Sequence, residues 1–291
     1  MWKRINKQYF IQDSFDISTF RSPGRLNSRL ASWEPNEKSL RWYRTFVNLA
    51  FDSSTDQTKE LMWKMRGQME LGSPITNTSN YKSRRIVHNL DYLIAIEEFF
   101  YLKNYLILGD ELNILEVGAG FGRTAHVILE EMPKVKKYFI FDLPEMLKVS
   151  SEYLRNVLSI ELYKKLRFIS EISEIKNQVF SLGMQIDGFQ EMSTHVIDDI
   201  YLKLLANCEL VYLKNPVGKY LPSSGGLSVK PTQAPLGLGR SLDILDIWNP
   251  ADAEHLFLKH VEVYKPSSHK VLDYSPERLF PHYLNIVYKK A

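Results

Sequence analysis

The sequence predicts an α/β fold built around a mostly parallel sheet, and three observations support this prediction. A short apolar run over residues 114–117 is followed at once by a glycine-rich turn and a helical pattern. Further apolar runs then alternate with helical segments, as repeated β-α units do. Hydrophobic and charged residues make up 44% and 24% of the 291 residues, which is ordinary for a globular protein. The length suits one large domain or a domain with an appended helical cap.

Composition and charge argue against several classes of protein. The net charge of +3 is too small to indicate a nucleic-acid partner. No apolar run approaches the roughly 18 to 20 residues that a membrane span requires. The first residues lack the apolar core of a secretory signal, and Cys208 is the only cysteine, so no internal disulfide can form. We therefore expect a cytoplasmic protein without a membrane span.

Residues 1–85 predict a helical cap in front of the main domain, which we assign to residues 86–291. The cap is rich in aromatic residues, including Trp33 and Trp63, and such residues are usually buried. Residues 71–80 break the helical pattern with Gly, Pro and small polar residues, which favours a hinge or a binding loop. From residue 84 to residue 106 the pattern is helical again, and this helix should cover the sheet.

The glycine-rich turn is the feature on which the functional interpretation depends. Gly118 and Gly120 let the backbone bend sharply and approach a ligand, and a helix follows directly. A dinucleotide site needs a small residue where this chain has Arg123, so NAD is disfavoured. Glu116, at the tip of the preceding strand, can instead accept hydrogen bonds from an ammonium group. Glu116 therefore suits S-adenosylmethionine, which has an amino acid tail and no phosphate. We predict that Glu116, Gly118, Gly120 and Arg123 bind this cofactor.

A second acid follows the next predicted strand. Residues 138–141 form an apolar run that ends in Asp142, roughly twenty residues after the glycine turn. A carboxylate at this point can bind both ribose hydroxyls of a nucleoside, because it has two acceptor oxygens. The alternative is that Asp142 only caps the helix that begins beside Pro144. We predict that Asp142 binds ribose and that its neighbour Leu143 also contacts the cofactor.

Residues 166–169, 184–187 and 210–213 are predicted as the third, fourth and fifth strands, with helices rich in Leu, Met and Lys between them. Ligands of such sheets bind beyond the carboxyl ends of the strands. Residues 217–249 concentrate glycine, proline and small residues, and a loop of this length is usually functional or disordered. We predict that they form a substrate lid. Residues 261–264 and 283–288 predict an antiparallel pair of strands that closes the sheet.

Four motifs together resemble a known family. They are Glu-x-Gly-x-Gly-x-Gly-Arg-Thr-Ala from residue 116, Phe-Asp-Leu-Pro from 141, Gly-Phe-Gln-Glu-Met from 188 and Leu-Lys-Asn-Pro from 213. The first is the signature of class I methyltransferases. The set is similar to the sugar O-methyltransferases of bacterial polysaccharide and natural-product clusters, over about residue 72 to the C-terminus. The resemblance implies a Rossmann-like fold, S-adenosylmethionine as donor, and a hydroxyl of a glycan or sugar nucleotide as acceptor.

Methyl transfer to a sugar hydroxyl usually needs a base, because that hydroxyl is weakly acidic. Glu191 and His195 are four residues apart at the start of a predicted helix, so they should share one face. His195 suits proton transfer at neutral pH, and Glu191 could orient it or hold an acceptor hydroxyl. The alternative is that Glu191 only compensates the helix dipole. Asp187 is expected at the cofactor, and it is a candidate base, with His88, if His195 is not.

Other polar residues are weaker candidates. Tyr81 and Arg84 could close over the methionine carboxylate, Arg84 through a bidentate contact, or could belong to a solvated basic face. The candidate acceptor-binding residues are His88, Lys214, Asn215 and His282. A structural role is the alternative for the first of these. No cluster of Cys, His and carboxylates has the spacing of a metal site, so no metal is expected.

Three functions remain open at this point. The first is a sugar-directed O-methyltransferase. The second is a methyltransferase for another small acceptor, such as a phosphate-type capsule substituent or an amine. The third is a catalytically silent protein that binds S-adenosylmethionine and serves as a partner subunit. A base within hydrogen-bond reach of the acceptor would separate the enzymes from the silent protein.

Overall fold

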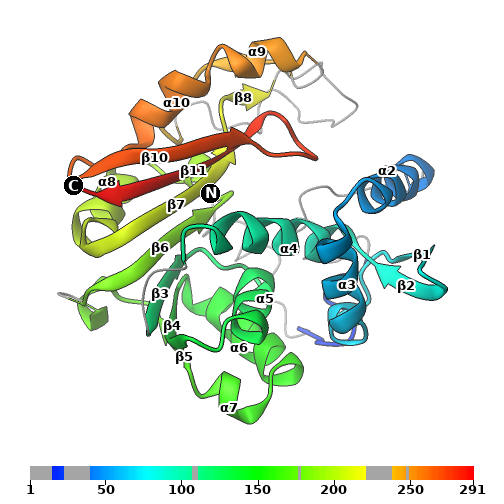
Figure 1. The fold of residues 1–291 in the computed structure, drawn as a ribbon. Helices are drawn as coiled ribbons and strands as arrows, with labels where there is room; N and C mark the ends of the chain where they lie inside the picture. Colours follow the sequence, from blue (N-terminus) through cyan, green and yellow to red (C-terminus); the bar gives the residue numbers. More distant parts are fainter. Residues whose placement is uncertain (1–14, 23–39, 107–110, 176–177, 221–237, 247–248) are drawn as a thin grey trace.

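A seven-stranded sheet forms the centre of the computed structural model, with the strand order β10-β11-β7-β6-β3-β4-β5 (Figure 1). The structure describes residues 15–22, 40–106, 111–175, 178–220, 238–246 and 249–291. Strands β3 to β7 are parallel, whereas β11 is antiparallel to both β7 and β10. The predicted α/β fold with an antiparallel C-terminal pair is confirmed.

The parallel strands coincide with the predicted apolar runs. They are β3 (Leu112–Val117), β4 (Val135–Phe141), β5 (Leu166–Ile169), β6 (Phe180–Ile186) and β7 (Cys208–Pro216). Successive residues point to opposite faces of the sheet, and both faces are buried under helices. This explains why residues 138–141 and 210–213 are continuously apolar instead of alternating with polar residues.

The C-terminal pair consists of β10 (His269–Pro276) and β11 (Tyr283–Lys290). The prediction of a strand over residues 261–264 is wrong, because these residues end helix α10 (Phe257–Tyr264). Its buried residues are His260, Val261 and Tyr264, whose spacing of three and four residues places them on one helical face. Packing of that face overrides the preference of Val261 for strands.

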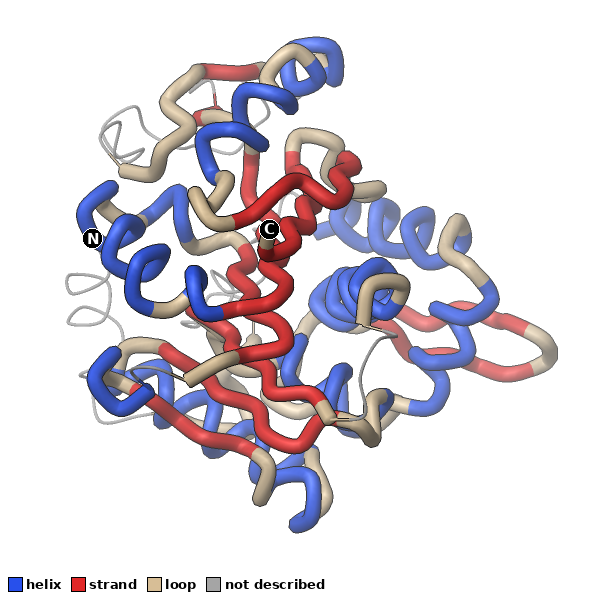
Figure 2. The backbone as a smooth tube through the Cα atoms, turned by 60° about the vertical axis from the view of Figure 1, so that its left-hand side comes forward, coloured by secondary structure: helices blue, strands red, loops and turns tan. Residues whose placement is uncertain are grey.

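Helices cover both faces of the sheet (Figure 2). One core lies under α4 (Leu90–Lys103), α5 (Arg123–Glu131) and α6 (Pro144–Val157), and includes sheet residues such as Ile114 and Tyr138. The other core lies under α8 (Thr194–Lys203) and α10, and includes Leu115 and Phe139. Two shorter helices are α7 (Ile160–Tyr163) and α9 (Pro250–Glu254).

The N-terminal part contains α2 (Leu40–Asp52), α3 (Asp56–Lys64) and the hairpin of β1 (Asn77–Tyr81) and β2 (Arg84–His88). The predicted cap is therefore helical only in part. The prediction of a loop up to residue 80 and of a helix from residue 84 is wrong over the hairpin. Lys82 and Ser83 have positive φ angles of 47° and 62°, as a two-residue hairpin turn requires. The predicted helix is confirmed over α4, and the predicted domain boundary after residue 85 falls inside β2.

The predicted lid is described only in part. Its ends form β8 (Lys219–Tyr220) and β9 (Ile244–Leu245), which pair in parallel. Residues 221–237 and 247–248 lie outside the described part of the chain, as does Trp33 of the predicted cap. None of the described helices combines the length and the apolar composition that a membrane span needs. Cys208 is buried at the start of β7 as a free thiol.

Candidate functional site

A cavity of about 540 Å³ opens at the carboxyl ends of β3, β4 and β6. Its walls are the glycine turn, the segment after β4, and the short helix η4 (Phe189–Glu191) with the start of α8. Its position and its volume are those of ligand sites in α/β proteins. The predicted site residues that line it are Glu116, Gly118, Gly120, Arg123, Asp142, Leu143, Asp187 and Glu191.

The glycine turn needs its glycines for two different reasons. Gly118, Gly120 and Gly122 have φ angles of 75°, 60° and 95°, a region that other residues rarely adopt. A Cβ atom on Gly118 would meet no atom within 4 Å, so the backbone here borders open space. A Cβ atom on Gly122 would lie 2.8 Å from Leu154 of α6. The turn therefore exposes its backbone to the cavity and packs closely against α6.

Asp142 lies at the tip of β4, next to the glycine turn. Its carboxylate accepts hydrogen bonds from the backbone N–H of Leu143 at 2.7 Å and of Gly120 at 3.3 Å. Burial raises the pKa of Asp142 to about 6. These contacts fix the carboxylate against the cavity wall. The Asp142 carboxylate accepts hydrogen bonds from its own loop and still lines the cavity. A local capping role is therefore compatible with the predicted binding of ribose.

Glu116 lies at the tip of β3 and is almost fully buried beneath the same cavity. The hydroxyl of Tyr138 on β4 donates a hydrogen bond to its carboxylate at 2.7 Å. Burial, together with the nearby Glu98 carboxylate, raises the pKa of Glu116 to about 8. The free site therefore holds a carboxyl group that readily ionises when a cation approaches.

Asp187 follows β6 in a strained conformation. Its φ angle of 55° is unusual for a residue other than glycine, and such strain concentrates at functional sites. Its N–H donates to the carbonyl of Lys214 at 2.8 Å, and its carboxylate accepts a hydrogen bond from the Tyr283 hydroxyl at 3.0 Å. The side chain is accessible from the cavity, and partial removal from water raises its pKa to about 6.

The structure separates Glu191 from His195. Glu191 ends η4 and lines the cavity, whereas His195 is exposed on α8 and is not among the lining residues. The prediction that they share one helical face is wrong, because Met192 and Ser193 between them are extended, with ψ angles of 148° and 150°. Spacing of four residues aligns side chains only within one continuous helix.

Two predicted cofactor residues and one predicted acceptor residue lie on the β1–β2 hairpin instead of the cavity wall. Arg84 donates a hydrogen bond to Glu60 of α3 at 2.9 Å, and Tyr81 does not line the cavity either. His88 is fully buried and stacks on Phe51, with ring centroids 4.2 Å apart. Burial lowers its pKa to about 4. The structural alternative fits His88, since Ser79 hydrogen-bonds its ring at 3.0 Å.

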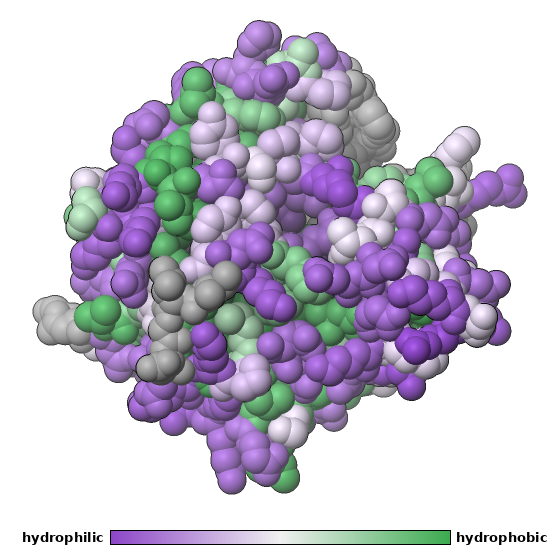
Figure 3. Space-filling view, in the orientation of Figure 1, coloured by the Kyte–Doolittle hydropathy of each residue, from purple (hydrophilic) through white to green (hydrophobic). Residues whose placement is uncertain are grey.

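Of the three remaining predicted acceptor residues, Lys214, Asn215 and His282, only Lys214 lines a second, smaller cavity. Lys214 is buried and pairs with Glu98 at 3.0 Å, and both line a cavity of about 170 Å³ between α4 and the β10–β11 loop. Figure 3 shows a hollow near the centre of one face of the molecule, with a largely hydrophilic rim. Asn215 is buried and donates to Gln185 at 2.7 Å. Burial lowers the pKa of His282 to about 4, and its ring contacts Phe280.

Sequence reasoning missed three residues that position the site. Glu98 on α4 supports Arg123 and Lys214, Tyr138 supports Glu116, and Tyr283 supports Asp187. A local signal existed only for Glu98, which is an acid within the apolar sequence Ile-Ala-Ile-Glu-Glu-Phe-Phe. The other contacts join residues 22 and 96 positions apart, so only the fold reveals them. Within the described residues, no group of three or more His, Cys, Asp and Glu side chains could hold a metal ion.

Comparisons with known proteins find similar structures but no matching family or sequence. No protein-family model matches the chain, and no curated protein matches its sequence. The structure is similar to the mitomycin 7-O-methyltransferase MmcR, with 11% identity and a TM-score of 0.44 over 62% of this chain and 49% of that one. This chain thus spans about half the length of MmcR.

Two further structures show the same level of similarity. An O-methyltransferase family protein from Burkholderia thailandensis has 9% identity and a TM-score of 0.44, over 69% of this chain and 58% of that one. The methyltransferase domain of bacterial CtHen1-CN has 13% identity and a TM-score of 0.48, over 70% of this chain and all of that one. The fold of this chain, judged from its own strand order, is a mixed Rossmann-like sheet.

Proposed function

We propose that this protein is an S-adenosylmethionine-dependent methyltransferase that acts on a hydroxyl oxygen. The observation that carries this proposal is the pair of carboxylates at neighbouring strand tips, Glu116 and Asp142, on either side of an open glycine turn. Asp142 suits the two hydroxyls of a ribose, and Glu116 suits an ammonium group. An acidic site of this kind does not suit a pyrophosphate, and Arg123 occupies the position where a dinucleotide site needs a small residue.

Two features of the cavity fit S-adenosylmethionine. The backbone at Gly118 borders open space, and the cavity is large enough for a nucleoside with an amino acid tail. When bound, S-adenosylmethionine supplies a methyl group whose bond to sulfur breaks, with the electron pair staying on sulfur, as the acceptor oxygen takes the carbon. The chain itself must then align the acceptor and remove its proton.

Asp187 is the residue best placed to accept that proton. It is accessible from the cavity, and its pKa near 6 leaves it largely ionised at neutral pH while keeping it basic enough to act. The Tyr283 hydroxyl donates a hydrogen bond to one of its oxygens at 3.0 Å, and Glu191, which lines the same cavity, binds the acceptor hydroxyl. His195, the earlier candidate, lies outside the cavity lining.

The acceptor class is the finer part of the proposal. A hydroxyl of a sugar, glycan or sugar nucleotide is favoured by the resemblance of the four sequence motifs. Carboxylates such as Asp187 and Glu191 are common hydrogen-bond acceptors for hydroxyl groups. Another small acceptor, such as an amine or a phosphate-type substituent, would bind in the same cavity. A silent partner subunit would use only the part of the cavity that binds the cofactor.

Calorimetry with S-adenosylhomocysteine, the demethylated product, tests the cofactor. We expect wild-type protein to bind it, and Asp142→Ala to weaken binding by about 1.5 to 3 kcal/mol, because two hydrogen bonds to a charged group are lost. Glu161→Ala, an exposed acid on α7, is the matched control and should bind normally. Absence of binding by the wild type, or equal binding by Asp142→Ala, would contradict the assignment.

Incubation with labelled S-adenosylmethionine and a panel of sugar nucleotides, free sugars and amines then tests the reaction. Label on a sugar hydroxyl supports the favoured acceptor class. Label only on an amine would replace it. Cofactor binding without transfer to any member of the panel supports the silent partner subunit.

A further inference from the structure

The second cavity, of about 170 Å³, lies beside the proposed base. Its walls come from α4, from β7 and from the hairpin of β10 and β11. Asp187 donates its backbone N–H to the carbonyl of Lys214, whose side chain lines the second cavity. Tyr283, which donates its hydroxyl to Asp187, and Asn285, which lines the second cavity, are two residues apart on β11. Their side chains therefore point to the same face of the sheet, and the second cavity adjoins Asp187 on that face.

Glu277 is the buried acid of the second cavity. It is 4% exposed, and one of its carboxylate oxygens accepts a hydrogen bond from the backbone N–H of Phe280. Among the described residues, no cation pairs with Glu277 and no donor reaches its second oxygen. A buried carboxylate oxygen without a donor is costly, so this cavity favours a ligand that donates hydrogen bonds. The other carboxylates that line the cavity each pair with a cation, Glu97 with Arg278 and Glu98 with Lys214.

Lys214 brings hydrogen-bond donors to the same cavity. Its ammonium group is buried and donates to Glu98 at 3.0 Å, a contact that uses one of its three N–H groups. A ligand can thus donate to Glu277 and accept from Lys214. A hydroxyl group does both, so neighbouring hydroxyls of one sugar ring suit the two side chains together. A ligand ammonium would meet Lys214, and a ligand carboxylate would meet the acids of the cavity.

The volume of the second cavity limits what it can hold. A cavity of roughly 150 Å³ accepts an unsubstituted six-membered ring such as benzene. The second cavity, at about 170 Å³, is therefore large enough for one ring with its hydroxyl-bearing edge. It is too small for a nucleotide. Size and charge together indicate an uncharged ligand group that carries hydroxyls.

We propose that the second cavity binds the hydroxyl groups of a neutral sugar acceptor, with Glu277 as hydrogen-bond acceptor and Lys214 as donor, while the reacting hydroxyl lies at Asp187. This inference rests on the proposed function, because it names the acceptor of the same reaction. It makes Glu277 a residue that determines acceptor specificity. It also gives Lys214 the acceptor-binding role that the sequence predicted.

Saturation-transfer NMR tests the ligand class on wild-type protein that is saturated with S-adenosylhomocysteine. The probes are the methyl glycosides of glucose, galactose and mannose, each compared with its uronic acid and its amino sugar. We expect at least one neutral glycoside to bind, by roughly tenfold or more over its charged counterparts, because like charges repel in a buried site. Absence of binding by every neutral glycoside, or equal binding by a charged counterpart, would overturn the proposal.

Two variants test the residue. Glu277→Gln keeps an oxygen for the Phe280 N–H but replaces the second oxygen with an amide donor. It should weaken the neutral glycoside by roughly tenfold and leave S-adenosylhomocysteine binding unchanged, because Glu277 does not line the first cavity. Glu161→Gln, at an exposed position of α7, is the matched control and should bind both ligands as the wild type does. A folded Glu277→Gln protein, checked by circular dichroism, that binds the glycoside normally would overturn the proposal.

The two levels of the hypothesis fail in different ways. Wild-type protein that does not bind S-adenosylhomocysteine would refute the proposed function and this inference with it. Wild-type protein that binds S-adenosylhomocysteine but no neutral glycoside would refute only the role of the second cavity. The comparison of ligands on the wild type decides the proposal even where Glu277→Gln does not fold.

Discussion

Single residues of the site differ in how well their sequence context predicts them. Glu116, Gly118 and Asp142, which the sequence predicted to bind the cofactor, line the cavity, because strand, turn and strand tip follow closely in the chain and local geometry places them. Tyr81 and Arg84 do not, because a two-residue turn folds their segment into a hairpin. Periodicity could not reveal this turn, since Lys82 and Ser83 adopt positive φ angles that such residues rarely take.

The proposed base is Asp187, whereas the sequence favoured His195. Asp187→Asn should lower single-turnover rates at saturating donor by about a hundredfold or more, because the amide cannot accept the acceptor proton at neutral pH. His195→Ala should turn over at nearly wild-type speed, since His195 does not line the cavity. Both variants should bind S-adenosylhomocysteine. A hundredfold loss in His195→Ala with an active Asp187→Asn would restore the histidine as base.

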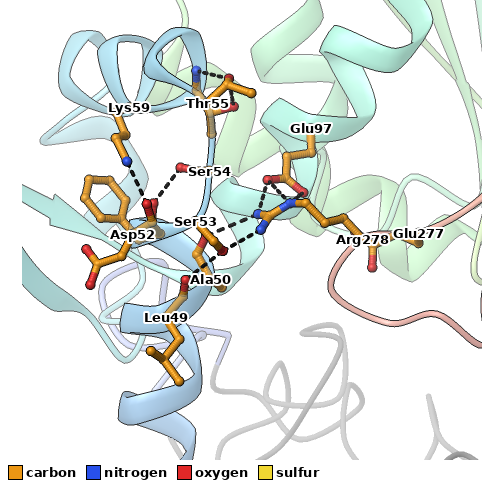
Figure 4. A network of polar contacts seen from close by, with 12 residues as sticks. Leu49, Ala50, Asp52, Ser53, Ser54, Thr55, Lys59, Glu97, Glu277 and Arg278 are labelled. Atoms are coloured by element: carbon orange, nitrogen blue, oxygen red, sulfur yellow. Dashed lines mark hydrogen bonds and ion pairs between the residues drawn. The ribbon is translucent and has the colours of Figure 1, made fainter. Parts of the chain in front are cut away.

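At the scale of elements, long-range contacts join parts that the sequence describes as separate. Arg278 in the β10–β11 loop pairs with Glu97 of α4 and donates hydrogen bonds to the Ser53 hydroxyl at 2.7 Å and to the Ala50 carbonyl at 3.1 Å (Figure 4). Ala50 belongs to the C-terminal end of α2. One side chain thus joins the cap, α4 and the C-terminal hairpin. Residues 228 positions apart give no local signal for this contact.

Arg278→Ala should destabilise the protein by about 1 to 2 kcal/mol in chemical unfolding, because it leaves Glu97 without its cation and frees the end of α2. Burial already raises the pKa of Glu97, so loss of the pair should favour its neutral form. Lys265→Ala removes an exposed pair with Glu262 one helical turn away and is the matched control, with a change near zero. Equal effects of the two substitutions would show that Arg278 is not a structural link.

At the scale of the whole molecule, the sequence predicts an apolar core on both faces of the sheet. It does not predict which polar residues are buried in that core. Continuous apolar runs indicate a doubly covered sheet, and the two observed cores agree with this. Histidines from distant segments are also removed from water, and burial lowers the pKa of each. They are His88, His126 and His260. Sequence alone cannot separate a buried neutral histidine from a catalytic one, because both occur among apolar neighbours.

The buried histidines predict how stability depends on pH, and His88 gives the cleanest case. Its pKa is about 4 in the folded protein and about 6.5 in an unfolded chain, so the unfolded state binds the proton first as pH falls. The contribution of His88 to the free energy of unfolding is complete above pH 6.5 and decreases toward pH 4, by about 2 kcal/mol between pH 7 and pH 5.

His88→Gln should therefore lose about 2 kcal/mol less stability than wild type between pH 7 and pH 5 in guanidinium unfolding. Other titrating groups are common to both proteins and cancel in this comparison. His195→Gln, at an exposed site, should retain the wild-type dependence, and a His88→Gln protein that also retains it would show that His88 takes up its proton in the folded state.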